Sequence, residues 1–249
     1  MPSRGYVVVG TTKRFFYMSA INCIESLKSY YPEAHVTLFT EERFLDGQEW
    51  IADKVEFVPD HKRSKLLGMA KTPYEETFYI DCDCQVEHED IAKVFDELED
   101  YDMVFTGLPP ERHYCYAEVY FPGATKSDGS KGGFELCGGV CLYSMKNPLM
   151  KEFMDEWHDL TIRQYDGLWW PKDENGKEDT KNYPSSFKRW DQFSLWWLLN
   201  KEEKYRSLKV GIFEDDARWN FFNGYLFEHN KDPVVIRHFS NVGHLKNKY

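Results

Sequence analysis

The stretch Phe78-Tyr79-Ile80-Asp81-Cys82-Asp83 decides the fold class, because an apolar, β-prone run ends there in two aspartates separated by one residue. Side chains alternate between the faces of a strand, so Asp81 and Asp83 can point to the same side while Cys82 points away. Two neighbouring carboxylates repel each other unless a cation lies between them, and such oxygen ligands suit Mg²⁺ or Mn²⁺. The alternative is that the aspartates only close a strand and cap the next helix.

The rest of the chain alternates between strand-like and helix-like patterns. Strands are predicted at 6–9, 36–39, 55–58, 78–80, 103–105, 138–143 and 234–238. Helices are predicted at 20–27, 64–70, 91–98, 148–160 and 190–199. Asn147-Pro148 is a typical helix start, with an Asn cap followed by Pro at the first position. This order predicts an α/β fold with a mostly parallel central sheet flanked by helices, and ligands at the carboxyl ends of the strands.

Two irregular segments interrupt the pattern. Residues 109–133 are rich in Gly, Pro and polar groups, and we expect them to form a surface excursion near the site. Residues 164–189 carry tryptophans and many charges, and this segment is too polar for a core and too long for a plain turn, so we expect a lid or an acceptor-binding loop. No stretch resembles a linker between two halves, so residues 1–249 are expected to form a single domain.

Composition narrows the classes of function. The net charge of −11 disfavours nucleic acid as a partner, since phosphate backbones are bound by surplus Lys and Arg. The chain has no run of about 18 apolar residues for a membrane span, and residues 1–9 lack the apolar core of a signal peptide. We therefore expect a cytoplasmic protein.

The cysteines are expected to be reduced thiols, because no secretory signal is evident. They are Cys23, Cys82, Cys84, Cys115, Cys137 and Cys141. Neither Cys82-x-Cys84 nor Cys137-xxx-Cys141 has the Cys-x-x-Cys spacing of a zinc knuckle, and both pairs lie in strand-like segments. A structural zinc site made by these pairs is not expected.

Several separated motifs together resemble glycosyltransferases with the GT-A fold, most closely the retaining, glycogenin-like and galactosyltransferase-like branch (family 8-like). The segment from Ser64-Lys65 through the paired aspartates to Asp90-Ile91 resembles the central motif of that family. Gly138-Gly139-Val140, Asp191-Gln192, Trp219-Asn220 and His238 then follow in the family's order. The resemblance covers most of the chain. It implies transfer of a hexose from a nucleotide diphosphate sugar, commonly UDP-linked, to a carbohydrate or other hydroxyl acceptor, with retention of anomeric configuration.

The resemblance implies that Asp81, Asp83 and His238 bind Mn²⁺ or Mg²⁺, which bridges the two phosphates of the donor. Such an ion neutralises the charge on the departing nucleoside diphosphate. A histidine ligand favours Mn²⁺ over Mg²⁺. His244 is the alternative ligand to His238.

The C-terminal residues depart from the family pattern. The family commonly follows its histidine with a glycine and then a lysine that reaches the diphosphate, whereas Asn241 and His244 stand at those spacings here. Lys246 is the nearest lysine and the candidate for this contact. A solvated tail lysine is the alternative.

Other donor contacts are also implied by position in the family pattern. Thr11 and Thr12 resemble residues that contact the base and ribose, and Tyr17 is placed to stack on the base. Lys65 resembles the helix residue near the donor sugar and phosphates, with a solvated helix lysine as the alternative.

The resemblance places Asp191 and Gln192 beneath the donor sugar, as the catalytic pair. A carboxylate or amide near the anomeric carbon stabilises an oxocarbenium-like transition state or orients the donor hydroxyls. The alternative is that Asp191 only caps its helix. An inverting enzyme would instead need a carboxylate base, for which Asp215 and Asp216 are candidates.

Aromatic side chains suited to stack on an acceptor sugar are Trp169, Trp170, Tyr183 and Trp190.

Two rival functions remain. A sugar nucleotidyltransferase usually carries a glycine-rich basic loop after the first strand, and the segment from Gly10 to Arg14 has the basic pair but one glycine. A catalytically idle carbohydrate-binding protein could keep the fold, although the retained Asp81, Asp83 and Asp191 argue against such decay.

Overall fold

The structure, a computed structural model, describes residues 2–99, 101–108, 135–213, 216–222 and 233–239. Several residues singled out from the sequence lie outside these ranges. They are the predicted excursion at 109–133 with Cys115, and Asp215, Asn241, His244 and Lys246.

A seven-stranded sheet forms the centre of the molecule, in the order β3-β2-β1-β4-β7-β6-β8. Its strands are β1 (Arg4–Gly10), β2 (Val36–Thr40), β3 (Lys54–Phe57), β4 (Glu76–Asp81), β6 (Met103–Leu108), β7 (Glu135–Ser144) and β8 (Val210–Ile212). Only β7, within the described residues, runs antiparallel to its neighbours β4 and β6, and the other pairs are parallel. The mostly parallel α/β sheet predicted from the sequence is confirmed.

A second, three-stranded sheet joins parts of the chain that are far apart in sequence. It contains β5 (Cys84–Val86), β9 (Phe221–Phe222) and β10 (Ile236–His238), in the order β5-β10-β9. β5 directly follows the paired aspartates, and β10 runs antiparallel to it with His238 opposite Cys84. This small sheet therefore brings β10 close to the end of β4.

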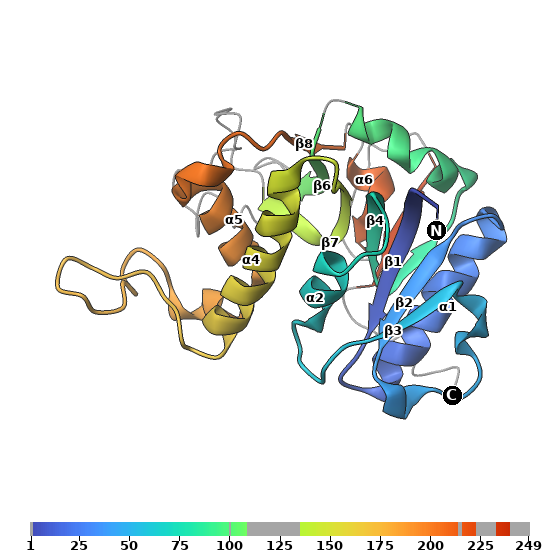
Figure 1. Cartoon of the computed structure of the whole chain (residues 1–249), viewed down its shortest axis with the longest axis horizontal. Coiled ribbons are helices and arrows are strands. Elements are labelled where there is room, and N and C mark those ends of the chain that lie inside the picture. The colour runs from blue at the N-terminus through green and yellow to red at the C-terminus, as the bar shows by residue number, and fades with distance from the viewer. Residues whose placement is uncertain (1, 100, 109–134, 214–215, 223–232, 240–249) are drawn as a thin grey trace.

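Helices cover both faces of the central sheet (Figure 1). α1 (Arg14–Tyr30) packs on one face, where Ile21 and Ile24 join Val8 and Ile80 in one core. The helices α2 (Ser64–Ala70), α4 (Pro148–Tyr165) and α5 (Asp191–Lys201) supply the other core. α4 begins as predicted, since the Asn147 side chain accepts a hydrogen bond from the Leu149 N–H and Pro148 occupies the first turn.

The remaining helical segments are short or of the 3₁₀ type. They are η1 (Glu42–Phe44), η2 (Glu49–Ile51), η3 (Glu89–Leu98), η5 (Ser185–Arg189), η6 (Glu203–Tyr205) and α6 (Asp216–Trp219). Among the described residues, no helix combines the length and the apolar character that crossing a membrane requires.

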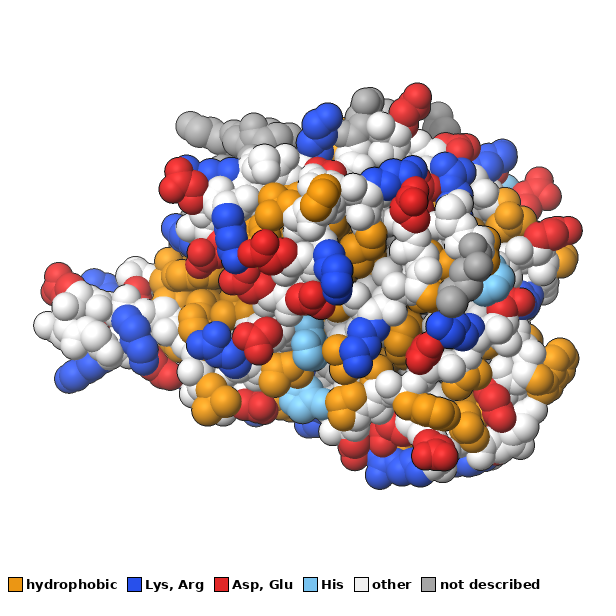
Figure 2. Space-filling model, in the orientation of Figure 1, with side chains coloured by type: hydrophobic (Ala, Val, Ile, Leu, Met, Phe, Trp, Pro, Cys, Tyr) orange, Lys and Arg blue, Asp and Glu red, His pale blue; other side chains and the backbone are white. Residues whose placement is uncertain are grey.

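The segment predicted to be irregular, 164–189, is partly core. Gln164 belongs to α4, and 185–189 form η5. The residues between them extend as an arm at the left of Figure 1, and Figure 2 shows hydrophobic side chains gathered where the arm joins the body. Trp170 is 2% exposed and stacks on Phe193 with ring centroids 4.6 Å apart. The prediction that Trp170 stacks on a sugar was wrong, because aromatic rings from η5 and α5 enclose it.

Candidate functional site

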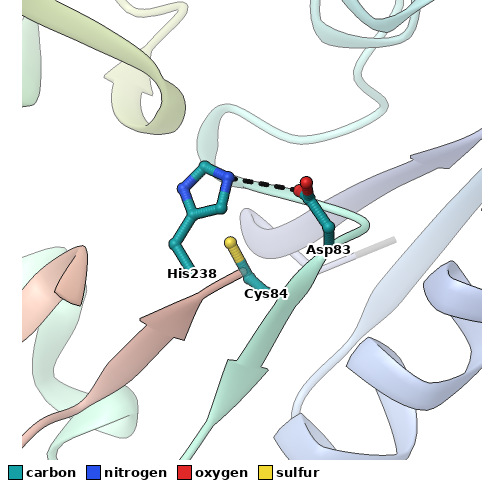
Figure 3. Close-up of side chains that lie close together, drawn as sticks. All are labelled: Asp83, Cys84 and His238. Atoms are coloured by element: carbon teal, nitrogen blue, oxygen red, sulfur yellow. Dashed lines mark ion pairs between the residues drawn. The ribbon is translucent and has the colours of Figure 1, made fainter. Parts of the chain in front are cut away.

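Asp81, Asp83 and His238 converge at the carboxyl end of β4. Asp81 is the last residue of β4, and Asp83 lies just before β5. His238 ends β10, and the pairing of β10 with β5 brings its Nε2 to 3.2 Å from the Asp83 Oδ1 (Figure 3). The three residues that were predicted from the sequence as metal ligands therefore lie close together in the structure.

A chain of buried side chains fixes the ring of His238. The Nδ1–H donates to the Asn220 Oδ1 at 2.8 Å, and the Asn220 amide donates to the Thr106 Oγ1 at 2.8 Å. All three side chains are buried. Because Nδ1 is used in this way, Nε2 is the nitrogen that faces Asp83, and such support is typical of histidines that bind metals. Trp219-Asn220 is one of the motifs in the sequence, but this role of Asn220 was not predicted from it.

Gly139 on β7 allows Asp81 and His238 to lie side by side. A Cβ at this position would be 2.7 Å from the His238 Cε1 and 2.9 Å from the Asp81 Oδ2. A glycine inside a strand often marks such a close approach. The space beside Gly139 is thus occupied by an imidazole and a carboxylate from two other strands.

The electrostatics of Asp81 favour a bound cation. Burial raises the pKa of its carboxyl group, which the Lys65 ammonium opposes and the Asp83 carboxylate reinforces. The Tyr79 hydroxyl also donates to the Asp81 Oδ1 at 2.5 Å. Two carboxylates and one imidazole are a suitable donor set for Mn²⁺, which takes oxygen and nitrogen ligands. The residues present therefore fit the ion that the sequence resemblance implied.

Asp191 lies next to this group and is held by two cations. It is the first residue of α5, and its Oδ2 is 2.8 Å from the Lys65 Nζ. The same Nζ is 3.6 Å from the Asp81 Oδ1 and donates to the Gly138 carbonyl at 3.3 Å. Arg63, which the sequence analysis did not single out, places Nη1 3.7 Å from the Asp191 Oδ1.

The charges of this group are mutually stabilised. Burial raises the pKa of Asp191, but Lys65 and Arg63 outweigh it and lower the pKa overall. Burial lowers the pKa of Lys65, but Asp191 and Asp81 outweigh it and raise the pKa overall. Asp191 is therefore a carboxylate and Lys65 an ammonium at neutral pH. The neighbouring Gln192 is half-buried.

A cavity of about 400 Å³ lies beside Asp81 and Asp83 and extends toward β1. Thr11, Thr12 and Lys65 also line it, as the sequence led us to expect. Thr12 has a φ of +69°, and its N–H donates to the Glu41 Oε1 at 2.5 Å. The left-handed backbone of Thr12 and this buried carboxylate fix the loop after β1.

The place of Tyr17 argues against the predicted base contact. Tyr17 is fully buried, and its hydroxyl lies between two carboxylate acceptors, 2.9 Å from the Asp46 Oδ1 and 3.0 Å from the Glu49 Oε2. Its ring also lies against Phe44. Phe16, one residue earlier, lines the cavity instead. Neighbouring residues on a helix point about 100° apart, so the ring of Phe16, and not that of Tyr17, lies at the cavity.

Comparison by sequence finds no match to a protein-family model or to a curated protein. Comparison by structure finds matches among solved structures. The galactosyltransferase LgtC, in complex with donor and acceptor sugar analogs, matches with a TM-score of 0.53 and 13% identity, over 97% of this chain and 87% of that chain. The glycosyltransferase GlyE of Streptococcus pneumoniae TIGR4 matches with 0.55 and 14%, over 96% and 54%. Mouse xyloside xylosyltransferase 1 matches with 0.53 and 10%, over 96% and 97%.

This chain has the GT-A fold. The resemblance noted in the sequence is confirmed at the level of the backbone. At identities of 10–14%, the matches establish the arrangement of strands and helices. The chemistry has to be argued from the side chains of this GT-A chain itself.

Proposed function

We propose that this protein is a glycosyltransferase that moves a hexose from a nucleotide diphosphate sugar to a hydroxyl acceptor, with Mn²⁺ or Mg²⁺ held by Asp81, Asp83 and His238. The observation that carries the proposal is the meeting of these three side chains at the carboxyl end of β4, beside a cavity. Parallel sheets place their ligands at this edge. UDP as the nucleotide is proposed from the sequence resemblance.

The cavity suits a nucleoside diphosphate. Lys13, Lys62, Arg63 and Lys65 line it, which provides positive charge on a chain whose net charge is −11. Thr11 and Thr12 line its end near β1 and are proposed to contact the nucleoside. When bound, the metal ion would neutralise the charge of the departing diphosphate. Lys246 remains a proposed diphosphate contact.

Asp191 and Gln192 are proposed to act at the sugar. Asp191 is ionised and buried, so its charge can stabilise positive charge that develops at the anomeric carbon. Arg63 and Lys65 prevent the carboxylate from taking a proton when water is excluded. Retention of configuration belongs to this proposal, as the sequence resemblance implied.

The test is a thermal-shift screen of nucleotide sugars with and without Mn²⁺. A ligand that binds only the folded state raises the melting temperature by mass action. We expect a donor to stabilise the protein only with the metal, and Asp83→Asn to remove that effect and lower turnover by about 100-fold or more. Asp159→Asn is the matched control, because that carboxylate is 65% exposed on α4.

Two results would contradict the proposal. Normal metal-dependent binding in the Asp83 variant would refute the metal assignment. Donor binding by the wild-type protein with neither transfer nor hydrolysis of the donor would favour a catalytically idle binding protein.

A further inference from the structure

Cys84 places a thiol within reach of the proposed metal ligands. Its Sγ, a carboxylate oxygen of Asp83 and a ring nitrogen of His238 all lie within 4.8 Å of one another (Figure 3). These residues carry three different kinds of ligand atom: sulfur, oxygen and nitrogen. The proposed Mn²⁺ or Mg²⁺ site of the glycosyltransferase uses the oxygen and nitrogen atoms and leaves the sulfur without a role.

The backbone fixes this arrangement. Cys84 and His238 are register partners in the β5-β10 pair, so their side chains leave the small sheet on the same face. The pairing continues past the end of the strands, since the Phe239 N–H donates to the Asp83 carbonyl at 2.9 Å. Cys84 is 5% exposed and His238 6% exposed. The thiol is therefore held beside the imidazole by hydrogen bonds on both sides of the pair.

The spacing of the ligand atoms is close to that of a tetrahedral zinc site. Zinc binds sulfur at about 2.3 Å and nitrogen or oxygen at about 2.0–2.2 Å, so its ligand atoms lie about 3.4–3.6 Å apart. The Asp83 Oδ1 and His238 Nε2 are already 3.2 Å apart, and Sγ lies within 4.8 Å of a carboxylate oxygen of Asp83 and of a ring nitrogen of His238. Small side-chain rotations would bring all three atoms to zinc distances.

We propose that Asp83, Cys84 and His238 bind Zn²⁺ and related thiophilic divalent cations, and that this binding blocks the donor site. The consequence rests on the proposed function, because the site must bind a diphosphate for zinc to block it. The proposed ligand set uses one cysteine, and so differs from a structural zinc site made by the pairs Cys82-x-Cys84 and Cys137-xxx-Cys141.

Asp81 explains why zinc would block the site and not replace Mn²⁺. Its Oδ2 and the His238 Cε1 both lie within 3 Å of the point that a Cβ on Gly139 would occupy, so the carboxylate stands beside the cluster, and it is proposed to turn toward the ion as the fourth ligand. Zinc with four protein ligands has a closed coordination shell, which leaves no position for a phosphate oxygen. Mn²⁺ takes oxygen ligands in octahedral sites and does not need the thiol.

The order of metal affinities supports competition at this site. Sites of mixed nitrogen, oxygen and sulfur ligands bind Zn²⁺ more tightly than Mn²⁺, and a thiolate adds to that preference. Zinc would displace the thiol proton to water as the sulfur–metal bond forms.

Titration with Co²⁺, a spectroscopic substitute for zinc, tests the inference without any donor. We expect a near-ultraviolet thiolate-to-cobalt charge-transfer band in the wild-type protein. Cys84→Ser should lose this band, and Cys141→Ser should keep it, because Cys141 is buried in the core on the other face of the central sheet. Melting temperatures measured without metal show whether each variant is folded. If a variant does not fold, the presence or absence of the thiolate band in the wild-type protein decides whether a cysteine binds the metal.

The outcomes separate this inference from the proposed function. Cobalt that binds without a thiolate band overturns the thiol ligand and leaves the metal site of the glycosyltransferase in place. Failure to bind cobalt at all overturns the zinc site, and the thermal shift with a nucleotide sugar and Mn²⁺ then decides the proposed function by itself.

Competition with Mn²⁺ supplies the second readout. We expect Zn²⁺ to abolish the Mn²⁺-dependent stabilisation by a nucleotide sugar. The zinc concentration that abolishes this stabilisation, at a fixed Mn²⁺ concentration, should be at least about tenfold higher in Cys84→Ser. The reason is that even residues that only support metal ligands contribute about 10- to 100-fold in affinity. An equal zinc requirement in the two proteins would overturn the inference.

Discussion

Gly139 is the residue where one added methyl group has the most specific consequence. A Cβ there would overlap the imidazole of His238 and the carboxylate of Asp81, both of which come from other strands. Overpacking a tight position costs about 1–3 kcal/mol. The cost falls on side chains at the candidate metal site, whose positions must shift.

We therefore expect Gly139→Ala to weaken Mn²⁺-dependent donor binding by about tenfold or more, while the protein stays folded. Gly138→Ala is a close control, because its Cβ would meet Asp191, Lys65 and Trp157 at ordinary distances of 3.6–3.9 Å. Thermal shift and isothermal titration with donor and Mn²⁺ measure the effect. Equal weakening by the two variants would contradict the special role of Gly139.

At this scale the positions of the two candidate acidic ligands were easier to predict from the sequence than the residues around them. Asp81 and Asp83 follow from strand alternation, which is local. The role of His238 came from the resemblance alone, because no local pattern indicates that β10 pairs with β5. Arg63 and Asn220 were missed as site residues, since an ion pair or amide contact with a distant segment leaves no spacing to read.

Among the elements, the start of α5 depends most on its neighbours. The Gln164 side chain on α4 donates to the carbonyl of Phe187 at 3.0 Å and to that of Trp190 at 2.7 Å. Trp190 immediately precedes Asp191. The two ends of the segment 164–189, which was predicted as a loop, therefore position Asp191, the candidate catalytic residue. Only the middle part of this segment forms the arm.

The arm itself is expected to serve the acceptor. Replacing residues 173–177 by two glycines removes its tip and keeps Gln164 and η5. Transfer to a panel of mono- and disaccharides should fall more than hydrolysis of the donor, because hydrolysis needs no acceptor contact. A same-length variant with serine at the exposed Glu174 and Lys177 is the control. Equal loss in transfer and hydrolysis, or no loss in either, would remove the acceptor role.

Elements with a strong local signal were predicted well. α2 was predicted at 64–70 and spans Ser64–Ala70. Predicted strands at 6–9 and 36–39 lie within β1 and β2. β5 and β9 were missed, because strands of three and two residues are defined by their distant partners and carry too little pattern of their own.

Across the whole molecule, the cores are joined through shared elements. Phe78 and Ile80 of β4 belong to the core beneath α1, and Tyr79 of the same strand belongs to the opposite core. α5 joins the second core to the aromatic cluster, through Leu195 on one side and Phe193 on the other. Neither core can lose its packing without disturbing an element of the other.

We therefore expect tryptophan fluorescence and far-ultraviolet circular dichroism to report the same urea midpoint. Five of the eight tryptophans lie in or against the aromatic cluster, so fluorescence reports mainly on that region. Circular dichroism reports on the sheet and helices. Coincident transitions are the test of a single cooperative unit. An earlier fluorescence midpoint would show that the aromatic cluster unfolds separately, and would contradict the single domain.

The pairing of β10 with β5 also bears on damage to the chain. Every strand of the central sheet precedes residue 213, whereas the histidine of the candidate site arrives only with β10. A premature stop codon or a protease cut between β8 and β10 would spare the large sheet and remove a proposed ligand. The resulting fragment would keep the strands of the large sheet and lack His238, so binding of the metal ion would report whether a chain extends through β10.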